Sequence, residues 1–363
     1  MNNKAFVVSA HFGTVGGGVR APYLLARELE NMGKQVTVFA GVTVFGDDRA
    51  LGNFTVHTPL MNKGWNYGIP IWVLSRQVIR AVKKQQPGLV IMCGLTGLAR
   101  HLLKSSIASE LTVWEFTNAT PDNPFVDPEA ARMISRCKRM LSPSFAIDEK
   151  IRQTYAYNGS IQRLPFWVEE RSFDLENGPE KVYDFIYLGR LHQDKGLNEL
   201  ISATAEIQSS HEDIRLLVVG PGDPSIFQKQ VAELGIGNYV TFKFFPAEVD
   251  VEEAVQQSKF LVLPSYHEGY PLVLLEAARF GVPFIATEVG SIPEMTLSSK
   301  AGLLIKPRDV RALRLAMIQV LLEPVNEYQS RSLAARELFC RLSGPNNVRD
   351  RLAKIDTSSI APP

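Results

Sequence analysis

Two glutamates eight residues apart, Glu268 and Glu276, flank an apolar stretch in "YHEGYPLVLLEAARFGVP". Glu268 lies in a turn rich in Gly and Pro, and Glu276 lies in the Leu- and Ala-rich segment after it, which is typical of a helix. Carboxylates accept hydrogen bonds from hydroxyl groups, which carbohydrates carry in number. We therefore interpret the two side chains as ligands for a polyhydroxyl molecule. The alternative for Glu276 is that it only caps or solvates its helix.

The start of that helix is expected to attract negative charge. Pro271 suits the first helical turn, because the N–H that it lacks would have no partner there in any helix. The neighbouring amides are expected to be free donors at the positive end of the helix dipole, and such a group binds phosphate. These amides belong to Tyr270, Leu272 and Val273.

Two cations, Arg190 and Lys195, follow the first strand expected in the second half of the chain, in "YLGRLHQDKG". Ligands of parallel α/β sheets bind at the carboxyl ends of the strands, so this loop is expected beside the two glutamates. Two cations at a strand end suit a pyrophosphate, whose charge they compensate. The alternative is a solvated loop.

A glycine-rich loop near the start, "GGGVRA" at residues 16–21, formally matches the dinucleotide fingerprint G-x-G-x-x-G/A. That fingerprint requires an acidic residue at the end of the second strand, where "VFAGVTVFG" has no carboxylate before Asp47. A dinucleotide cofactor is therefore rejected. Gly16, Gly17 and Gly18 are instead expected to let a phosphate or a sugar approach the backbone, with a tight strand-to-helix turn as the alternative.

The sequence predicts no metal site. In "EVDVEE", Asp250 is expected to be an N-cap, with Glu252 and Glu253 in the first turn of its helix, rather than part of a metal-binding pair. The six histidines form no ligand spacing. The three cysteines are too few and too scattered for a disulfide framework or a metal site.

The hydrophobic pattern predicts the elements that hold these residues. Strand-length apolar runs alternate with helical stretches in the first part, with strands at "KAFVVSA", "QVTVFA", "LVIMCG" and "LTVWEF". The rhythm pauses around residues 164–179, which are rich in Pro, Gly and charge. It restarts with "YDFIYLGR", "IRLLVVGPG", "YVTFKFF", "SKFLVLPS", "VPFIAT" and "AGLLIKP". A βαβ rhythm over 363 residues predicts an α/β protein with two Rossmann-like, doubly wound parallel-sheet domains, residues 1–165 and 166–343, and a ligand cleft between them.

Composition and charge exclude several classes of protein. Lys and Arg total 39 against 38 for Asp and Glu, so no global basic field draws nucleic acid. The longest apolar run outside the first strand, "LVIMCGLTGLA", is broken by Arg100 well short of a membrane span. We expect a cytoplasmic protein, soluble or at most peripheral at the inner membrane face. The aromatic segment "MNKGWNYGIPIWV", residues 61–73, suits a membrane surface or a lipid-linked acceptor, and equally a loop that packs on the core.

Together these motifs resemble those of the retaining glycosyltransferases of family 4, which have the GT-B architecture. "LGRLHQDKG" is similar to the family's G-R-L-x-x-x-K-G, "LLVVGPGDP" to its sugar-nucleotide loop, and "LPSYHEGYPLVLLEAARFGVPFIATEVGSIPE" to its E-x7-E signature. The resemblance covers nearly the whole chain and is weaker before residue 165. There, Val19 stands where the family usually has Glu, and "TVWEFTNATPDNP" stands where the family commonly has a His.

The resemblance implies a role for each candidate residue. Arg190 and Lys195 neutralise the diphosphate of a nucleotide sugar donor. Glu276 holds the ribose, and Glu268 holds hydroxyl groups of the transferred sugar. Further donor contacts are implied at Gly16, Gly17, Gly18, Phe245, Pro246, Tyr270, Pro271, Leu272 and Val273. Acceptor-side contacts are implied at Arg20, Glu115 and Asn118.

The activity implied is transfer of a hexose, with retention, from UDP-glucose or, as second choice, GDP-mannose. The acceptor would be a hydroxyl group of a carbohydrate or a lipid-linked saccharide, in polysaccharide or glycolipid biosynthesis. No metal or cofactor is implied, because the nucleotide sugar is a substrate. The C-terminal helix, residues 344–363, is implied to cross back onto the first domain. UDP-sugar 2-epimerases share this fold, and a non-catalytic sugar-nucleotide-binding protein is a further alternative.

Overall fold

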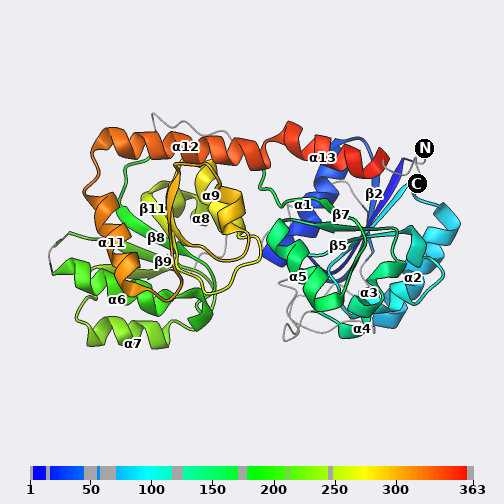
Figure 1. Cartoon of the computed structure of the whole chain (residues 1–363), viewed down its shortest axis with the longest axis horizontal. Helices are drawn as coiled ribbons and strands as arrows, with labels where there is room; N and C mark the ends of the chain where they lie inside the picture. The colour runs from blue at the N-terminus through cyan, green and yellow to red at the C-terminus, as the bar shows by residue number, and fades with distance from the viewer. Residues whose placement is uncertain are drawn as a thin grey trace. The chain divides into compact units, whose positions relative to one another are not determined.

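The computed structural model describes residues 3–13, 17–44, 55–57, 71–116, 126–170, 178–209, 211, 213–243 and 248–357. The chain divides into two compact units (Figure 1). Unit 1 comprises Met1–Trp167 and Pro345–Pro363, and unit 2 comprises Val168–Gly344. The fold class predicted from the sequence is confirmed, because each unit is built on a parallel sheet covered by helices.

Unit 1 contains, within its described residues, a seven-stranded parallel sheet in the order β3-β2-β1-β4-β5-β6-β7. The four predicted strands are β1, β2, β4 and β5, and the first two run longer than the sequence suggested. The remaining strands are short, and β3 and β7 have no fully buried residue, so their hydrophobic signal is weak. The bounds are β1 Lys4–Gly13, β2 Gln35–Val44, β3 Thr55–His57, β4 Leu89–Cys93, β5 Leu111–Trp114, β6 Arg139–Ser142 and β7 Ile161–Arg163.

The helices of unit 1 bury one face against this sheet. In α2, the buried residues Leu74, Val78 and Val82 recur every four positions, and they join a core cluster with Phe6 and Val8 of β1. The helices are α1 Gly17–Asn31, α2 Ile71–Gln85, α3 Gly97–Leu103, α4 Pro128–Arg132, α5 Phe145–Tyr155 and α13 Pro345–Thr357.

The C-terminal helix α13 belongs to unit 1. The predicted break before it is confirmed: α12 ends at Ser343, and Gly344 has φ −55° and ψ 135°, the extended backbone that a residue before proline prefers. Its buried residues Val348, Leu352 and Ile355 form an apolar stripe at helical spacing. Arg349 Nε lies 2.7 Å from Glu28 Oε1 of α1, which fixes the helix to the unit.

Unit 2 contains a six-stranded parallel sheet in the order β10-β9-β8-β11-β12-β13, and its six predicted strands are confirmed. The strands are β8 Tyr183–Leu188, β9 Leu216–Val219, β10 Val240–Lys243, β11 Ser258–Leu263, β12 Phe284–Thr287 and β13 Gly302–Ile305. The helices are α6 Leu197–Gln208, α7 Ser225–Glu233, α8 Glu248–Gln256, α9 Leu272–Arg279, α10 Ile292–Thr296, α11 Val310–Leu321 and α12 Val325–Ser343. The central strands β8 and β11 are the ones that the candidate cations and glutamates follow.

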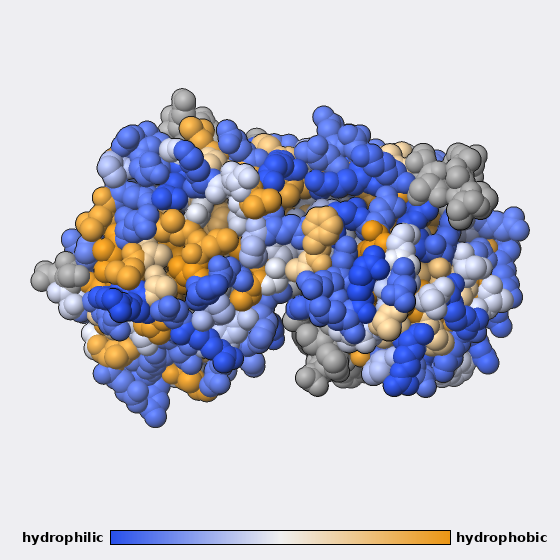
Figure 2. Space-filling view, viewed as in Figure 1, coloured by the Kyte–Doolittle hydropathy of each residue, from blue (hydrophilic) through white to orange (hydrophobic). Residues whose placement is uncertain are grey.

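The surface differs between the two units in the view of Figure 2, where hydrophobic colour gathers on unit 2 around α11 and unit 1 is mostly hydrophilic. Leu315 of α11 and Leu322, which directly follows the helix, are 50% and 67% exposed. Within the described ranges, every helix is too short or too polar to cross a membrane.

Candidate active site

Three loops of unit 2 meet at the carboxyl edge of its sheet, because β8, β11 and β12 run parallel and end on the same side. The loop after β8 is tied to the loop after β11, since the Tyr266 amide donates to the Asp194 carbonyl at 2.9 Å. The loop after β12 is tied to the same segment, since the Ser291 amide donates to the Gly269 carbonyl at 3.2 Å and the Ser291 hydroxyl donates to it as well. The candidate residues therefore sit on a cross-linked set of loops.

Two glycines allow these loops to approach so closely. Gly196 has φ +68°, and a Cβ there would lie 2.0 Å from the Pro264 carbonyl oxygen. Gly290 has φ +56°, and a Cβ there would lie 2.0 Å from the carbonyl oxygen of Glu268. A side chain at either position would meet backbone atoms and adopt an unfavourable φ, so only glycine fits.

Lys195 and Glu268, two residues predicted for the site, are brought into direct contact. Lys195 Nζ lies 2.8 Å from Glu268 Oε1, and the two side chains are 15% and 12% exposed. Lys195 ends a short 3-10 helix, η4 (Gln193–Lys195), while Glu268 lies in the loop after β11. The sequence did not predict this pairing, because it assigned the two side chains to different parts of a ligand. Within the protein, each compensates the charge of the other.

Arg190 lies at the solvent side of the same loop. Its Nη2 is 3.8 Å from Asp194 Oδ2, and its side chain is 64% exposed, so the guanidinium is accessible to a ligand. The backbone of Arg190 is held from below, because the Tyr187 hydroxyl donates to its carbonyl at 2.7 Å. Burial, helped by the charges of Glu268 and Asp194, raises the pKa of Tyr187, so this phenol stays a donor.

Helix α9 begins one residue later than the sequence suggested. Pro271 is its N-cap, with φ −73° and ψ 105°, rather than part of its first turn, because that extended ψ precedes the helical region. The amides of Leu272 and Val273 open the helix and have no acceptor in the described part of the chain. Glu276 is half-buried and lies one helical turn beyond Leu272. The buried residues Leu274, Leu275, Ala277 and Ala278 form the face of α9 that packs inward.

Tyr266 supports the loop that carries Glu268, and the sequence did not single it out. Its hydroxyl donates to Glu199 Oε1 of α6, and the Arg308 guanidinium lies over its ring at 4.5 Å from the centroid. Burial, the hydrogen bond to Glu199 and the charge of Glu199 raise the pKa of Tyr266 to about 12. A tyrosine two residues before Glu268 was the only available signal, because the partners are distant in sequence.

An ion pair behind α9 corrects the interpretation of "EVDVEE". Helix α8 begins at Glu248, so Asp250 lies inside the helix and is not its N-cap. Glu252 does not lie in an exposed first turn either. Its Oε1 lies 2.6 Å from Nη2 of Arg279, whose side chain is 1% exposed at the end of α9. The long-range pair, which local capping rules do not foresee, holds α8 against α9. In the part of the chain that the structure describes, no group of three or more His, Cys, Asp or Glu side chains is arranged to hold a metal ion.

The acceptor-side candidates of unit 1 are differently placed. The Glu115 side chain is fully buried, and its Oε2 accepts a hydrogen bond at 2.7 Å from the amide of Leu95, in the loop after β4. Burial and the charge of Glu115 raise the pKa of Tyr155 to about 12. Arg20 is buried in α1. Glu115 therefore supports a loop at the carboxyl edge of the sheet in this conformation, rather than reaching solvent.

The glycine-rich loop is only partly described. Gly17 opens α1, and a Cβ on Gly18 would meet no heavy atom within 4 Å, so the protein's own packing does not require a glycine at position 18. Gly16, Asn118, Phe245 and Pro246 lie outside the described residues.

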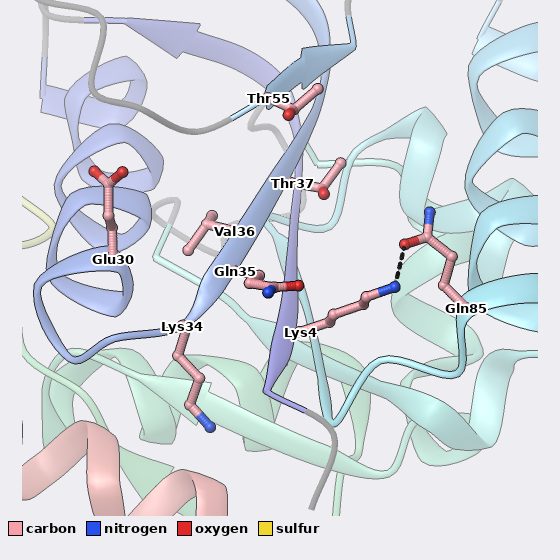
Figure 3. A pocket seen from close by; sticks show the side chains of 8 residues that line it. All are labelled: Lys4, Glu30, Lys34, Gln35, Val36, Thr37, Thr55 and Gln85. Atoms are coloured by element: carbon pink, nitrogen blue, oxygen red, sulfur yellow. Dashed lines mark hydrogen bonds between the residues drawn. The ribbon is translucent and has the colours of Figure 1, made fainter.

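A cavity of about 370 Å³ in unit 1 contains none of the predicted residues. It lies beside Lys4 and Gln35, which begin β1 and β2, and so at the amino edge of the sheet. Figure 3 shows that its side chains do not converge: Lys34 points away from Lys4, and Lys4 Nζ donates to Gln85 Oε1 at 3.2 Å. We therefore place the candidate site at the carboxyl edge of the unit 2 sheet.

Comparison with known proteins gives this placement a family context. Residues 168–338 match the model of the glycosyl transferases group 1 family, which covers nearly all of unit 2. The putative teichuronic acid biosynthesis glycosyltransferase TuaC of Bacillus subtilis is 33% identical over 193 residues, 50% of this chain and 46% of the relative. The glycogen synthase of Mycobacterium tuberculosis is 28% identical over 155 residues, 42% of this chain and 37% of the relative. The chain thus spans less than half the length of these relatives.

Solved structures resemble the whole chain. Sucrose-phosphate synthase from Thermosynechococcus elongatus matches with a TM-score of 0.75 and 18% identity, over 98% of this chain and 99% of its own. Anabaena Alr3699/HepE, solved with UDP-glucose, matches with a TM-score of 0.75 and 15% identity, over 98% of this chain and 100% of its own. At such identities the likeness establishes the fold alone, which is GT-B.

Proposed function

We propose that this chain is a glycosyltransferase that moves a hexose from a nucleotide diphosphate sugar to a hydroxyl acceptor. The observation that carries the proposal is the Lys195–Glu268 contact, 2.8 Å long, beside the start of α9 in the segment that matches the family model. A cation and free amides suit a diphosphate, and the carboxylates suit sugar hydroxyls. The names of the relatives support the same reaction class.

The donor we favour is UDP-glucose, with GDP-mannose second. A protein of the same fold was solved with UDP-glucose, which supports this choice. Glu276, one turn into α9, is assigned to the ribose, and Glu268 to the transferred hexose. Phe245 and Pro246 are assigned to the base, and the acceptor, a carbohydrate or lipid-linked saccharide, to unit 1.

The proposed mechanism is electrostatic. The bond between the anomeric carbon and the diphosphate oxygen breaks, and the acceptor oxygen bonds to that carbon on the same face. The acceptor proton passes to the departing diphosphate, so no protein nucleophile is needed. Arg190, Lys195 and the amides of Leu272 and Val273 stabilise the charge that develops on the leaving group. Lys195 can do so only by giving up part of its contact with Glu268, which the sugar hydroxyls then replace.

The first experiment is a thermal-shift panel of sugar nucleotides on the full chain. A bound donor raises the melting temperature, because it stabilises only the folded state. The same panel on Arg190→Ala and Lys195→Ala should show a smaller shift, and donor turnover in these variants should fall by roughly tenfold to a thousandfold. Unchanged turnover in both variants would rule out the diphosphate assignment. Conversion of UDP-N-acetylglucosamine without any acceptor would instead identify an epimerase.

The cations are proposed to act without a metal, and this is tested separately. Turnover that is unchanged by a chelator would support the assignment. A loss that added Mg²⁺ or Mn²⁺ reverses would contradict it, because the metal would then carry the charge compensation that we assign to Arg190 and Lys195.

A further inference from the structure

Helix α2 lies at the edge of unit 1 (Figure 1). Its outer face carries a row of cations. Trp72, Arg76, Arg80 and Lys84 are spaced four residues apart, so they form one stripe along the helix, and Lys83 lies beside it. All five side chains are exposed, and the opposite face is buried in the core of the unit. The stripe therefore lies on the surface of the folded unit.

None of these four cations lies within 4.0 Å of a carboxylate in the described part of the chain. The neighbouring helix α3 behaves differently. Arg100 Nε lies 3.4 Å from Asp127, and Lys104 Nζ lies 2.8 Å from Glu129. Among the described residues, the cations of α3 and its C-cap are thus compensated, and those along α2 are not.

The excess of positive charge extends through the surrounding sequence. Between Asp48 and Glu110 the chain has no acidic residue and eight basic ones, although the whole chain is balanced at 39 to 38. The eight are Arg49, Lys63, Arg76, Arg80, Lys83, Lys84, Arg100 and Lys104. Lys83 and Lys84 stabilise the helix, because they lie at its negative C-terminal end. Like charges four residues apart, such as Arg76 and Arg80, destabilise a helix. Helix stability therefore does not explain the stripe.

An apolar end distinguishes this stripe from a purely ionic surface. Ile71 and Trp72 are 46% and 48% exposed at the start of α2. The Arg76 guanidinium lies over the Trp72 ring, 5.0 Å from its centroid, so the indole is held beside the cations. Tryptophan favours the boundary between lipid headgroups and acyl chains, and lysine and arginine favour anionic headgroups.

We propose that the outer face of α2 docks unit 1 on an anionic phospholipid surface, with Arg76, Arg80, Lys83 and Lys84 at the headgroups and Trp72 at the acyl boundary. The contact is independent of the proposed transferase activity, because it uses no residue of the candidate site. A nucleic acid or an acidic protein would compensate the positive charge but would not bury the exposed side chains of Ile71 and Trp72. The lipid surface therefore fits the stripe better.

The test is co-sedimentation of the full chain with vesicles. One set contains equal amounts of phosphatidylcholine and phosphatidylglycerol, and the other contains phosphatidylcholine alone. We expect binding to the anionic vesicles only, weakening as salt is raised. Each cation near an anionic surface raises the binding constant about fivefold. Arg76→Gln combined with Arg80→Gln should therefore weaken binding to anionic vesicles roughly thirtyfold. Trp72→Ala should also weaken it. Lipids brominated near the headgroup should quench part of the tryptophan fluorescence of the parent, and Trp72→Ala should lose that part.

The matched control removes two exposed cations from unit 2, by Arg311→Gln combined with Lys300→Gln. It should bind anionic vesicles as the parent does, and circular dichroism should show that all variants are folded. Equal binding to neutral vesicles, or equal weakening by the control, would overturn the proposal. Binding to single-stranded DNA that needs the same arginines, with no binding to vesicles, would overturn it in favour of a nucleic acid.

Discussion

The Lys195–Glu268 pair makes a prediction that separates its structural role from its chemical one. At 2.8 Å and an effective dielectric constant near 20, the gross attraction between the two charges is about 6 kcal/mol. Desolvation of two side chains that are only 15% and 12% exposed offsets much of it. We expect a net coupling of about 1–3 kcal/mol between Lys195→Met and Glu268→Gln in the free energy of unfolding.

The assay is urea unfolding of the parent, both single variants and the double variant. The Lys259–Asp184 pair of unit 2 is a matched control, because it has the same 2.8 Å distance but its lysine is 45% exposed. Its coupling, measured with Lys259→Met and Asp184→Asn, should stay below about 1 kcal/mol. Strictly additive effects at Lys195 and Glu268 would refute the inference that the two charges compensate each other.

We expect the two single variants to have opposite effects on the affinity for UDP. Glu268→Gln frees Lys195 from its partner, so the affinity for UDP should hold or rise by up to about tenfold, while hexose transfer falls by about a hundredfold or more. Lys195→Met should weaken UDP binding. Calorimetry with UDP on each variant measures both effects. Loss of UDP affinity in Glu268→Gln would show that Glu268 belongs to the nucleotide site and not to the sugar.

Three further predictions concern the support of the site and the stability of unit 2. Gly196→Ala should lower the free energy of unfolding by more than about 1 kcal/mol, because residue 196 has φ +68° and the new Cβ would lie 2.0 Å from the Pro264 carbonyl oxygen. An unchanged urea midpoint would contradict this. Tyr266→Phe loses the hydrogen bond to Glu199 and should lower kcat about ten- to hundredfold, with little change in UDP affinity. An equal loss of kcat and of UDP affinity would show that Tyr266 contacts the nucleotide. Burial lowers the pKa of Lys181 to about 8. Between about pH 8 and pH 10 the unfolded chain therefore binds more protons at this residue than the folded chain, so the free energy of unfolding should rise with pH relative to Lys181→Met. Urea midpoints of the two proteins that run parallel across that range would contradict this.

The fold followed from the sequence where apolar runs were long. The runs that became β8, β11 and β12 are buried central strands, and their hydrophobic residues identify them without knowledge of their partners. The strands β3 and β7 have only three residues each and no buried position, so their pairing with neighbours, and not their own pattern, makes them strands.

The candidate site was predictable as a set of loops but not as a set of contacts. Parallel strands place their carboxyl ends together, so Lys195 and Glu268 could be assigned to one edge of the sheet. Their direct pairing joins positions 73 residues apart, which no local pattern reveals. The prediction for Glu252 was wrong for the same reason. Local capping rules predict exposed charges at helix ends, whereas Glu252 forms a buried ion pair with Arg279.

The most direct measurement follows the anomeric carbon of the donor by NMR. The full chain is incubated with UDP-glucose or GDP-mannose, isotope-labelled at that carbon, together with a set of saccharide acceptors. We predict that the signal moves from a phosphate ester to a glycoside of the same anomeric configuration, that an equal amount of nucleoside diphosphate appears, and that both changes are slowed at least tenfold in Lys195→Ala. A sugar that isomerises with no nucleotide released, or a donor that binds and stays intact with every acceptor, would contradict the assignment as a glycosyltransferase.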